Sequence, residues 1–149
     1  MHGNKVSLII ADADAIIALS NKEDANHEKA KYLLESLLTR ATILFPVTTI
    51  CEAATVLRGR LNKPEEAATI IKRFQSGDIP IQGVDSDTLT EAVALFNPTG
   101  SKKNTLFDAV VAALAKRLNA DAIFSFDQWY QKIGLTLVSD FIEQSKHAA

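Results

Sequence analysis

Acidic side chains recur in this sequence directly after short apolar runs or in the first turns of amphipathic segments. Five share such a position: Asp12, Asp14, Glu52, Asp108 and Asp127. In an open parallel sheet, ligands bind outside the carboxyl ends of the strands, so side chains at those ends meet at one edge. Two carboxylates about 4 Å apart repel by about 4 kcal/mol at an effective dielectric constant near 20. A gathering of these acids therefore needs a cation.

The donor set narrows the choice of cation, because no histidine or cysteine accompanies these acids. Hard oxygen ligands favour Mg²⁺ or Mn²⁺, which commonly bridge substrate phosphates. The chemistry they predict is metal-assisted phosphoryl transfer to water. Asp85 and Asp87 also follow an apolar run, so position at an edge does not select the site residues uniquely.

The elements that must position these acids alternate along the chain. Apolar runs predict strands over 6–11, 43–47, 79–84, 122–126 and 135–138, and helical spacing predicts helices over 15–19, 26–38, 49–60, 64–77, 85–96 and 105–119. Strands separated by helices imply right-handed crossovers and a mainly parallel sheet. We therefore expect an α/β fold whose central sheet has helices on both faces.

Most of the acids also have a purely local interpretation. Thr49–Glu52 and Thr105–Asp108 have the form of capping boxes, in which the acid at the third helical position binds the backbone before the helix. Asp127 and Asp14 are candidate N-caps, Asp14 for a helix that begins at Ala15. Asp12 is harder to explain locally, because it ends a strand expected to be buried on both faces, where an unpaired charge is costly.

Length and composition indicate the number of domains, the net charge and the expected location of the protein. The 149 residues suit one domain, expected over 1–140 with a tail over 141–149. Sixteen Lys plus Arg against 18 Asp plus Glu give a net charge of −2, so any polyanionic partner must be held locally. The single cysteine, Cys51, is expected to be a small buried residue in a reducing compartment, and no apolar stretch is long enough to span a bilayer. These features predict a cytoplasmic protein.

Four stretches together resemble the PIN-domain nucleases. They are IIADADAIIAL around Asp12, VTTICEAATVLR around Glu52, LFDAVVAALA around Asp108 and IFSFD ending at Asp127. The resemblance extends over nearly the whole chain and is greatest to the VapC-type toxins of toxin–antitoxin pairs. It implies a single PIN-like domain and a Mg²⁺- or Mn²⁺-dependent endoribonuclease.

The resemblance also implies roles for particular residues. The acids that match Asp12 and Asp108 hold the metal in that family, and those that match Glu52 and Asp127 complete the acidic pocket, so all four are candidate catalytic and metal-binding residues. Ser125 stands where such nucleases often carry a hydroxyl near the substrate phosphate. Asp14 departs from the family, which has Ser or Asn there, and adds charge that could bind a second ion or weaken phosphate approach.

Cationic and aromatic side chains have wider interpretations. Arg58 and Arg60, with Lys63, form the densest basic group and are candidates for binding an RNA backbone, although they also suit a solvated helix end. Lys102 and Lys103 are a further candidate phosphate contact in a loop that is otherwise simply solvated. Trp129 and Tyr130 are expected to pack a short turn against the core rather than to stack on bases.

The resemblance implies partners as well: an RNA substrate, an antitoxin whose cationic side chain enters the acidic pocket, and a second copy of the chain. Apolar residues around Leu33 and Leu37 are the expected surface of that homodimer. Two alternatives remain open on sequence alone. One is a PIN-like module that binds RNA or protein without cutting; the other is a haloacid-dehalogenase-type phosphatase, because Asp12-Ala-Asp14 has that family's Asp-x-Asp form.

Overall fold

Parallel strands and covering helices alternate along the chain, as the sequence predicted. The computed structural model describes residues 5–147. Within that range the strands are β1 (Ser7–Ala11), β2 (Ala41–Pro46), β3 (Ile81–Gln82) and β4 (Ala122–Phe124). The helices are α1 (Ala13–Ser20), α2 (His27–Leu37), α3 (Val47–Arg58), α4 (Pro64–Gln75), α5 (Ser86–Leu95), α6 (Leu106–Arg117), α7 (Trp129–Lys132) and α8 (Val138–His147).

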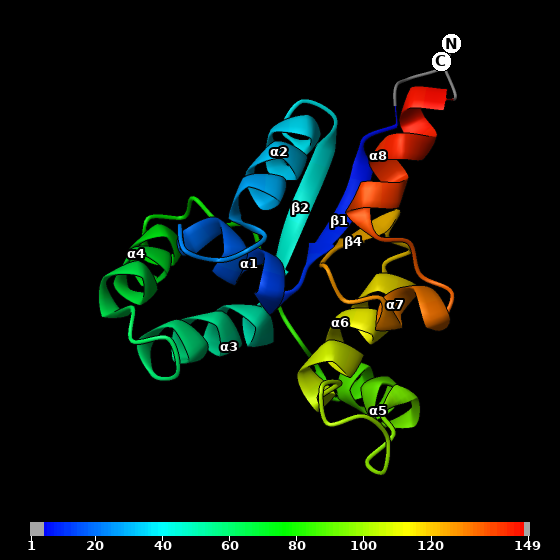
Figure 1. The fold of residues 1–149 in the computed structure, drawn as a ribbon. Coiled ribbons are helices and arrows are strands. Elements are labelled where there is room, and N and C mark those ends of the chain that lie inside the picture. Colours follow the sequence, from blue (N-terminus) through cyan, green and yellow to red (C-terminus); the bar gives the residue numbers. More distant parts are fainter. Residues whose placement is uncertain (1–4, 148–149) are drawn as a thin grey trace.

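The four strands form one parallel sheet in the order β3-β2-β1-β4 (Figure 1). In β1, at its centre, Ile9 and Ile10 are completely buried and belong to different layers of the core. Ile9 packs with α2 and α8, whereas Ile10 packs with α6 and α7. The sheet is thus covered on both faces, which confirms the expected α/β architecture.

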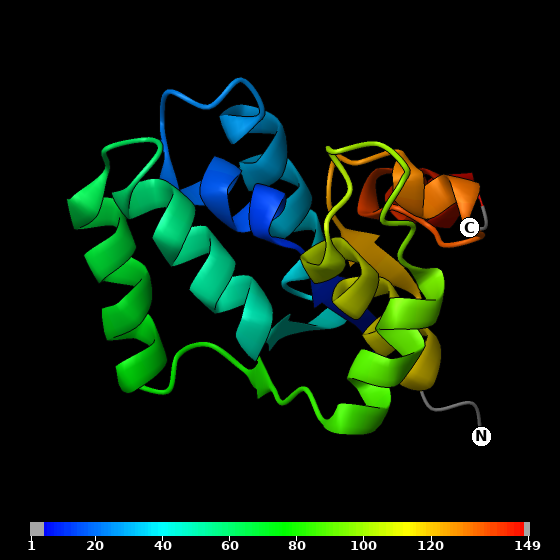
Figure 2. The same cartoon turned by 90° about the horizontal axis from the view of Figure 1, so that it is seen from below.

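The remaining helices pack in pairs beside the sheet. Figure 2 shows α3 and α4 side by side at one end of the molecule, and α5 packed on α6 nearer the other end. A third apolar cluster fixes the first pair to α1 through Ile16, Ala53 and Leu57. This arrangement places the first turns of α1 and α6 and the inner side of α3 at the carboxyl end of β1.

One expected strand is absent, a second is shorter than expected, and Cys51 is not buried as expected. Residues 135–138 form no strand; Leu137 makes an isolated bridge to Ile123, and α8 begins at Val138. The run predicted over 79–84 contains a strand of only two residues, β3. Cys51 is exposed, because it faces outward from α3 rather than into the core.

The expected dimer surface is also wrong in its residues. Leu33 and Leu37 are 4% and 0% exposed, because they are the core-facing side of α2 in the layer that contains Ile9. Their side chains are therefore not available to a second copy of the chain. No helix within residues 5–147 has the length and apolar content needed to cross a membrane.

Candidate active site

The first acid of the site, Asp12, directly follows β1 and begins α1. Its backbone N–H donates to the Phe124 carbonyl at 3.0 Å, so the hydrogen bonding between β1 and β4 continues to this residue. Its side chain is the N-cap of α1 and accepts from the Ala13 N–H at 2.7 Å. Asp12 is only 4% exposed. The fold therefore holds a carboxylate inside the protein at the end of the central strand.

Glu52 reaches the same place from α3. The expected capping box at Thr49 is wrong, because α3 begins at Val47, directly after Pro46, and Glu52 lies in its second turn. Proline has no N–H and a fixed φ, which suits the start of a helix. From this position the Glu52 side chain points toward Asp12, and its buried Oε2 atom has no hydrogen-bond partner.

Asp108 comes from the first turn of α6, where the predicted capping box is confirmed. Its Oδ2 atom accepts from the Thr105 N–H at 2.8 Å. The residue is 8% exposed. The local and the functional interpretations of Asp108 are compatible, because capping occupies one of its two carboxylate oxygens.

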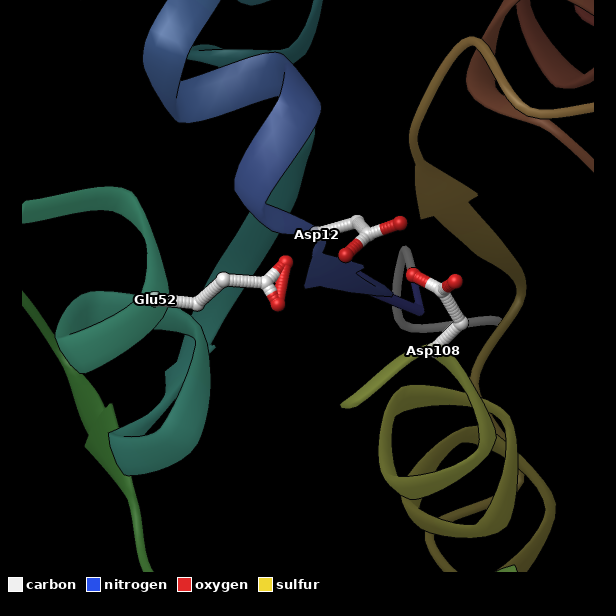
Figure 3. A group of neighbouring side chains, drawn as sticks. All are labelled: Asp12, Glu52 and Asp108. Atoms are coloured by element: carbon white, nitrogen blue, oxygen red, sulfur yellow. The ribbon is translucent and has the colours of Figure 1, made fainter. Parts of the chain in front are cut away.

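These three carboxylates converge from different elements, as Figure 3 shows. Asp12, Glu52 and Asp108 each contribute an oxygen, and these oxygens all lie within 4.8 Å of one another. None of the salt bridges formed within residues 5–147 involves them. Three of the four acids that the family resemblance assigned to the site thus form one group without a paired cation.

The electrostatics of this group follow from burial and mutual repulsion. Burial, and then the charge of Asp14, raises the pKa of Asp12 to about 7. Burial, and then the charge of Asp12, raises the pKa of both Glu52 and Asp108 to about 7. Each carboxylate is thus hard to ionise beside the others unless a cation joins them.

The group fits a divalent metal ion. Its donors are all carboxylate oxygens, which Mg²⁺ and Mn²⁺ prefer to nitrogen or sulfur. The Oε2 atom of Glu52 accepts no hydrogen bond in the structure, so it is free to act as a metal ligand in this group. The residues present therefore match the ion that the sequence led us to expect.

Asp14 and Ser125 extend the acidic group toward β4. The expectation that Asp14 caps a helix is wrong, because α1 begins two residues earlier than predicted, with Asp12 as its cap. Instead, the Oδ2 atom of Asp14 accepts from Ser125 Oγ at 3.0 Å and from the Phe126 N–H at 2.8 Å. Ser125 Oγ also lies 3.3 Å from Oδ2 of Asp12, so its single proton is shared between the two acids. Burial, the largest influence, raises the pKa of Asp14 to about 6.

Asp127 borders the three-carboxylate group without belonging to it. The N-cap of α7 is Gln128 and not Asp127 as predicted, although the Oδ1 atom of Asp127 accepts from the Trp129 N–H at 2.9 Å. Its Oδ2 atom accepts from Asn104 Nδ2 at 3.0 Å. Both oxygens thus already have donors. The charge of Asp127 nevertheless raises the pKa of Asp108 and of Asp14, after larger contributions from burial.

Tyr130 is a site residue that the sequence did not reveal. As expected, it packs a short turn against the core, and it is completely buried. Its hydroxyl, however, donates to Oδ2 of Asp12 at 2.7 Å. The two residues are 118 positions apart, so no local spacing could indicate this contact. The only available signal was a buried tyrosine near an acid-bearing strand end.

The cations differ in how they relate to the site. Arg58 is exposed at the end of α3, whereas the charge of Arg60 lowers the pKa of Glu52, which burial otherwise raises. Lys63 forms a salt bridge with Glu23 at 3.0 Å. Lys102 and Lys103 are exposed in the loop before α6. Among the basic residues singled out in the sequence, Arg60 is thus the one whose charge acts on Glu52.

The acids after the third predicted strand lie outside the group. Asp85 caps α5 by accepting from the Thr88 N–H at 2.8 Å, and these hydrogen bonds lower its pKa. Asp87 is exposed on the first turn of α5. Asp85 and Asp87 follow a predicted strand, as Asp12 does, yet they do not belong to its acidic group. A position after a strand is therefore not sufficient to identify a site residue.

Comparisons with known proteins place the fold. The family model of the PIN domain matches residues 9–134. No curated protein sequence matches the chain. VapC20 of Mycobacterium tuberculosis, a toxin that cleaves the sarcin–ricin loop, has a similar structure, with a TM-score of 0.76 and 20% identity over 86% of this chain and 96% of that one. VapBC2 of Rickettsia felis, solved with a promoter DNA fragment, gives a TM-score of 0.64 and 16% identity over 87% and 96% of the two chains.

Proposed function

This chain belongs to the PIN domain family, and on that premise we propose that it is a metal-dependent endoribonuclease, the toxin of a toxin–antitoxin pair. The observation that carries the proposal is the group formed by Asp12, Glu52 and Asp108, whose oxygens lie within 4.8 Å of one another. Such a group has little structural use, because burial and repulsion raise the pKa of all three acids. It is suited to holding a divalent cation.

In this proposal the three carboxylates hold Mg²⁺ or Mn²⁺. When bound, the ion supplies a polarised water for attack on phosphorus and neutralises charge on the phosphate. Hydrolysis joins the water oxygen to phosphorus and breaks the bond from phosphorus to the leaving ribose oxygen. Asp127 completes the acidic pocket and keeps its place through Asn104 and the Trp129 N–H.

The substrate follows from the same site. Ser125, the proposed hydroxyl near the substrate phosphate, is buried and shares its single proton between Asp12 and Asp14, so contact with a phosphate would require that proton to leave both acids. Arg58 and Arg60 add positive charge at the exposed end of α3 and attract the RNA backbone. Since the chain as a whole has a net charge of −2, these local cations are needed to hold a polyanion.

The partners are part of the proposal. The similar structures named above are a VapC toxin and a VapBC pair, which supports a toxin that acts on RNA in the cytoplasm and is held inactive by an antitoxin. A cationic antitoxin side chain that enters the acidic group would compete with the metal for the same charge. A homodimer is also proposed, and it would use a surface other than Leu33 and Leu37.

Cleavage of mixed RNAs by the purified protein tests the function. We expect cleavage that requires Mn²⁺ or Mg²⁺ and is lost in D12N and in D108N, because each variant removes one charge from the group. D87N is the matched control, since Asp87 is exposed on α5 away from the site. Unchanged cleavage in both site variants would overturn the proposal and indicate a contaminating nuclease.

A further inference from the structure

Tyr130 is the most deeply buried polar contact of the acidic group. Its side chain is 0% exposed and packs among Ile10, Val111 and Leu137. A phenylalanine would fill the same apolar space, so packing alone does not require the hydroxyl. The hydroxyl instead lies 2.7 Å from Oδ2 of Asp12.

The same hydroxyl connects two of the three acid-bearing elements. It lies 3.4 Å from the backbone carbonyl of Asp108, in the first turn of α6. Tyr130 itself belongs to α7, a helix that contributes no carboxylate to the group. One buried oxygen atom therefore contacts both the side chain of Asp12 and the backbone of Asp108.

The other donors to Asp12 do not replace this contact. The Ala13 N–H occupies Oδ1. Ser125 Oγ is 3.3 Å from Oδ2 and closer, at 3.0 Å, to Asp14, so its proton has a competing acceptor. Hydrogen bonds from buried donors fix the orientation of a ligand side chain, and a carboxylate rotated away from the group loses the ion.

We propose that Tyr130 is a positioning residue: its hydroxyl fixes the Asp12 carboxylate in the orientation that binds the metal ion. This inference rests on the proposed function, since it assigns the metal to the group formed by Asp12, Glu52 and Asp108. It adds a residue that bears no charge and lies on an element outside that group.

The variant Y130F tests the inference, because it removes one oxygen and keeps the volume of the ring. Free Mn²⁺ in a titration, measured by electron paramagnetic resonance, gives affinity without any cleavage assay. We expect Y130F to bind Mn²⁺ roughly 10–100-fold more weakly than the unaltered chain. In RNA cleavage at fixed metal we expect a lower kcat with an unchanged KM for RNA.

Two controls separate positioning from packing. Y32F removes the hydroxyl of the chain's other tyrosine, which is 52% exposed and contacts Lys146, and should leave Mn²⁺ affinity unchanged. V111A loosens the same apolar cluster without removing a donor to Asp12, so it should lower Tm and leave the Mn²⁺ affinity of the folded protein within about twofold.

The outcomes are distinct. If D12N abolishes Mn²⁺ binding while Y130F binds within twofold of the unaltered chain, this inference is overturned and the proposed function stands. If V111A weakens Mn²⁺ binding as much as Y130F does, packing explains the effect and the inference is again overturned. An unaltered chain that binds no Mn²⁺ overturns the proposed function and this inference with it.

Discussion

Asp12 and Asp108 each use one carboxylate oxygen to begin a helix and still belong to the acidic group. Asp12 accepts from the Ala13 N–H, and Asp108 accepts from the Thr105 N–H. A helix N-terminus favours a negative charge, so the two helices help to hold acids where burial would otherwise exclude them. At this scale, helix capping and the proposed metal binding are compatible, because capping leaves one oxygen of each carboxylate available.

The three raised pKa values predict how stability depends on pH in the absence of metal. Asp12, Glu52 and Asp108 titrate near pH 7 in the folded chain, and near pH 4 when unfolded. Between these values the folded state holds protons that the unfolded state has released. The free energy of unfolding should therefore fall as pH rises from about 4 to 7, and remain low above that.

Thermal unfolding in a metal chelator checks this dependence. We expect a lower Tm at pH 8 than at pH 5. Adding Mn²⁺ at pH 8 should raise the Tm again, because Mn²⁺ at 100 times its Kd raises the free energy of unfolding by about 2.7 kcal/mol. E52Q should reduce the slope, because it removes one of the three carboxylates whose pKa is raised and one of the charges that repel the other two. E35Q, an exposed change on α2, should not. Metal-free protein that is more stable at pH 8 would contradict the prediction.

The residues that sequence reasoning found and missed differ in one physical respect. Asp12 and Asp108 were found because a charge at the end of a buried strand or in a helix's first turn is visible in local spacing. The misplaced caps at Thr49 and Asp14 follow from helices that begin earlier than the pattern suggested. Tyr130 was missed as a site residue because its hydrogen bond to Asp12 depends on how distant elements pack.

At the scale of elements, α2 shows how an apolar stripe is assigned to core or surface. Leu37, the last residue of α2, is completely buried in the core, whereas its neighbour Leu38 is 65% exposed. L37A should lower the free energy of unfolding by about 2–5 kcal/mol, because it leaves a cavity in the layer around Ile9. Chemical denaturation measures this loss.

L38A is the matched control, with the same atoms removed one position away. It should change the free energy of unfolding by less than about 0.5 kcal/mol. Equal effects of the two variants would show that Leu37 does not face the core.

The order of the elements was predictable, but the shortest ones were not. Long helices between apolar runs indicated parallel strands covered on both faces, and this follows from the length of the crossovers alone. The run 135–138 is apolar enough for a strand, yet Leu137 forms only a bridge to Ile123 before α8 begins. Whether so short a run pairs or coils depends on what lies beside it in space.

For the molecule as a whole, the distribution of charge matters more than its sum. An acidic group in a chain of net charge −2 repels RNA unless cations nearby compensate. The charge of Arg60 lowers the pKa of Glu52, against the larger influence of burial, whereas Arg58 is exposed at the end of α3. Arg60 should therefore contribute more than Arg58 to holding RNA near the acids.

Binding of single-stranded RNA to R60Q and R58Q, measured by fluorescence anisotropy in a D108N background, tests this ranking. If Arg60 neutralises one phosphate, R60Q should reduce the slope of log affinity against log salt by about 0.7. R58Q should reduce it less. A larger loss in R58Q than in R60Q would reverse the assignment.

The contact between Asp12 and Tyr130 spans most of the chain, and this has a consequence for how the protein is made. A ribosome that has released Asp12 and Glu52 has not yet synthesised Asp108, the β4 strand beside Asp12, or the tyrosine that holds its carboxylate. The nascent chain therefore carries two of the three acids before the third acid and the tyrosine beside Asp12 have been made. The proposed endoribonuclease would therefore gain its complete acidic group only after Tyr130 has been synthesised.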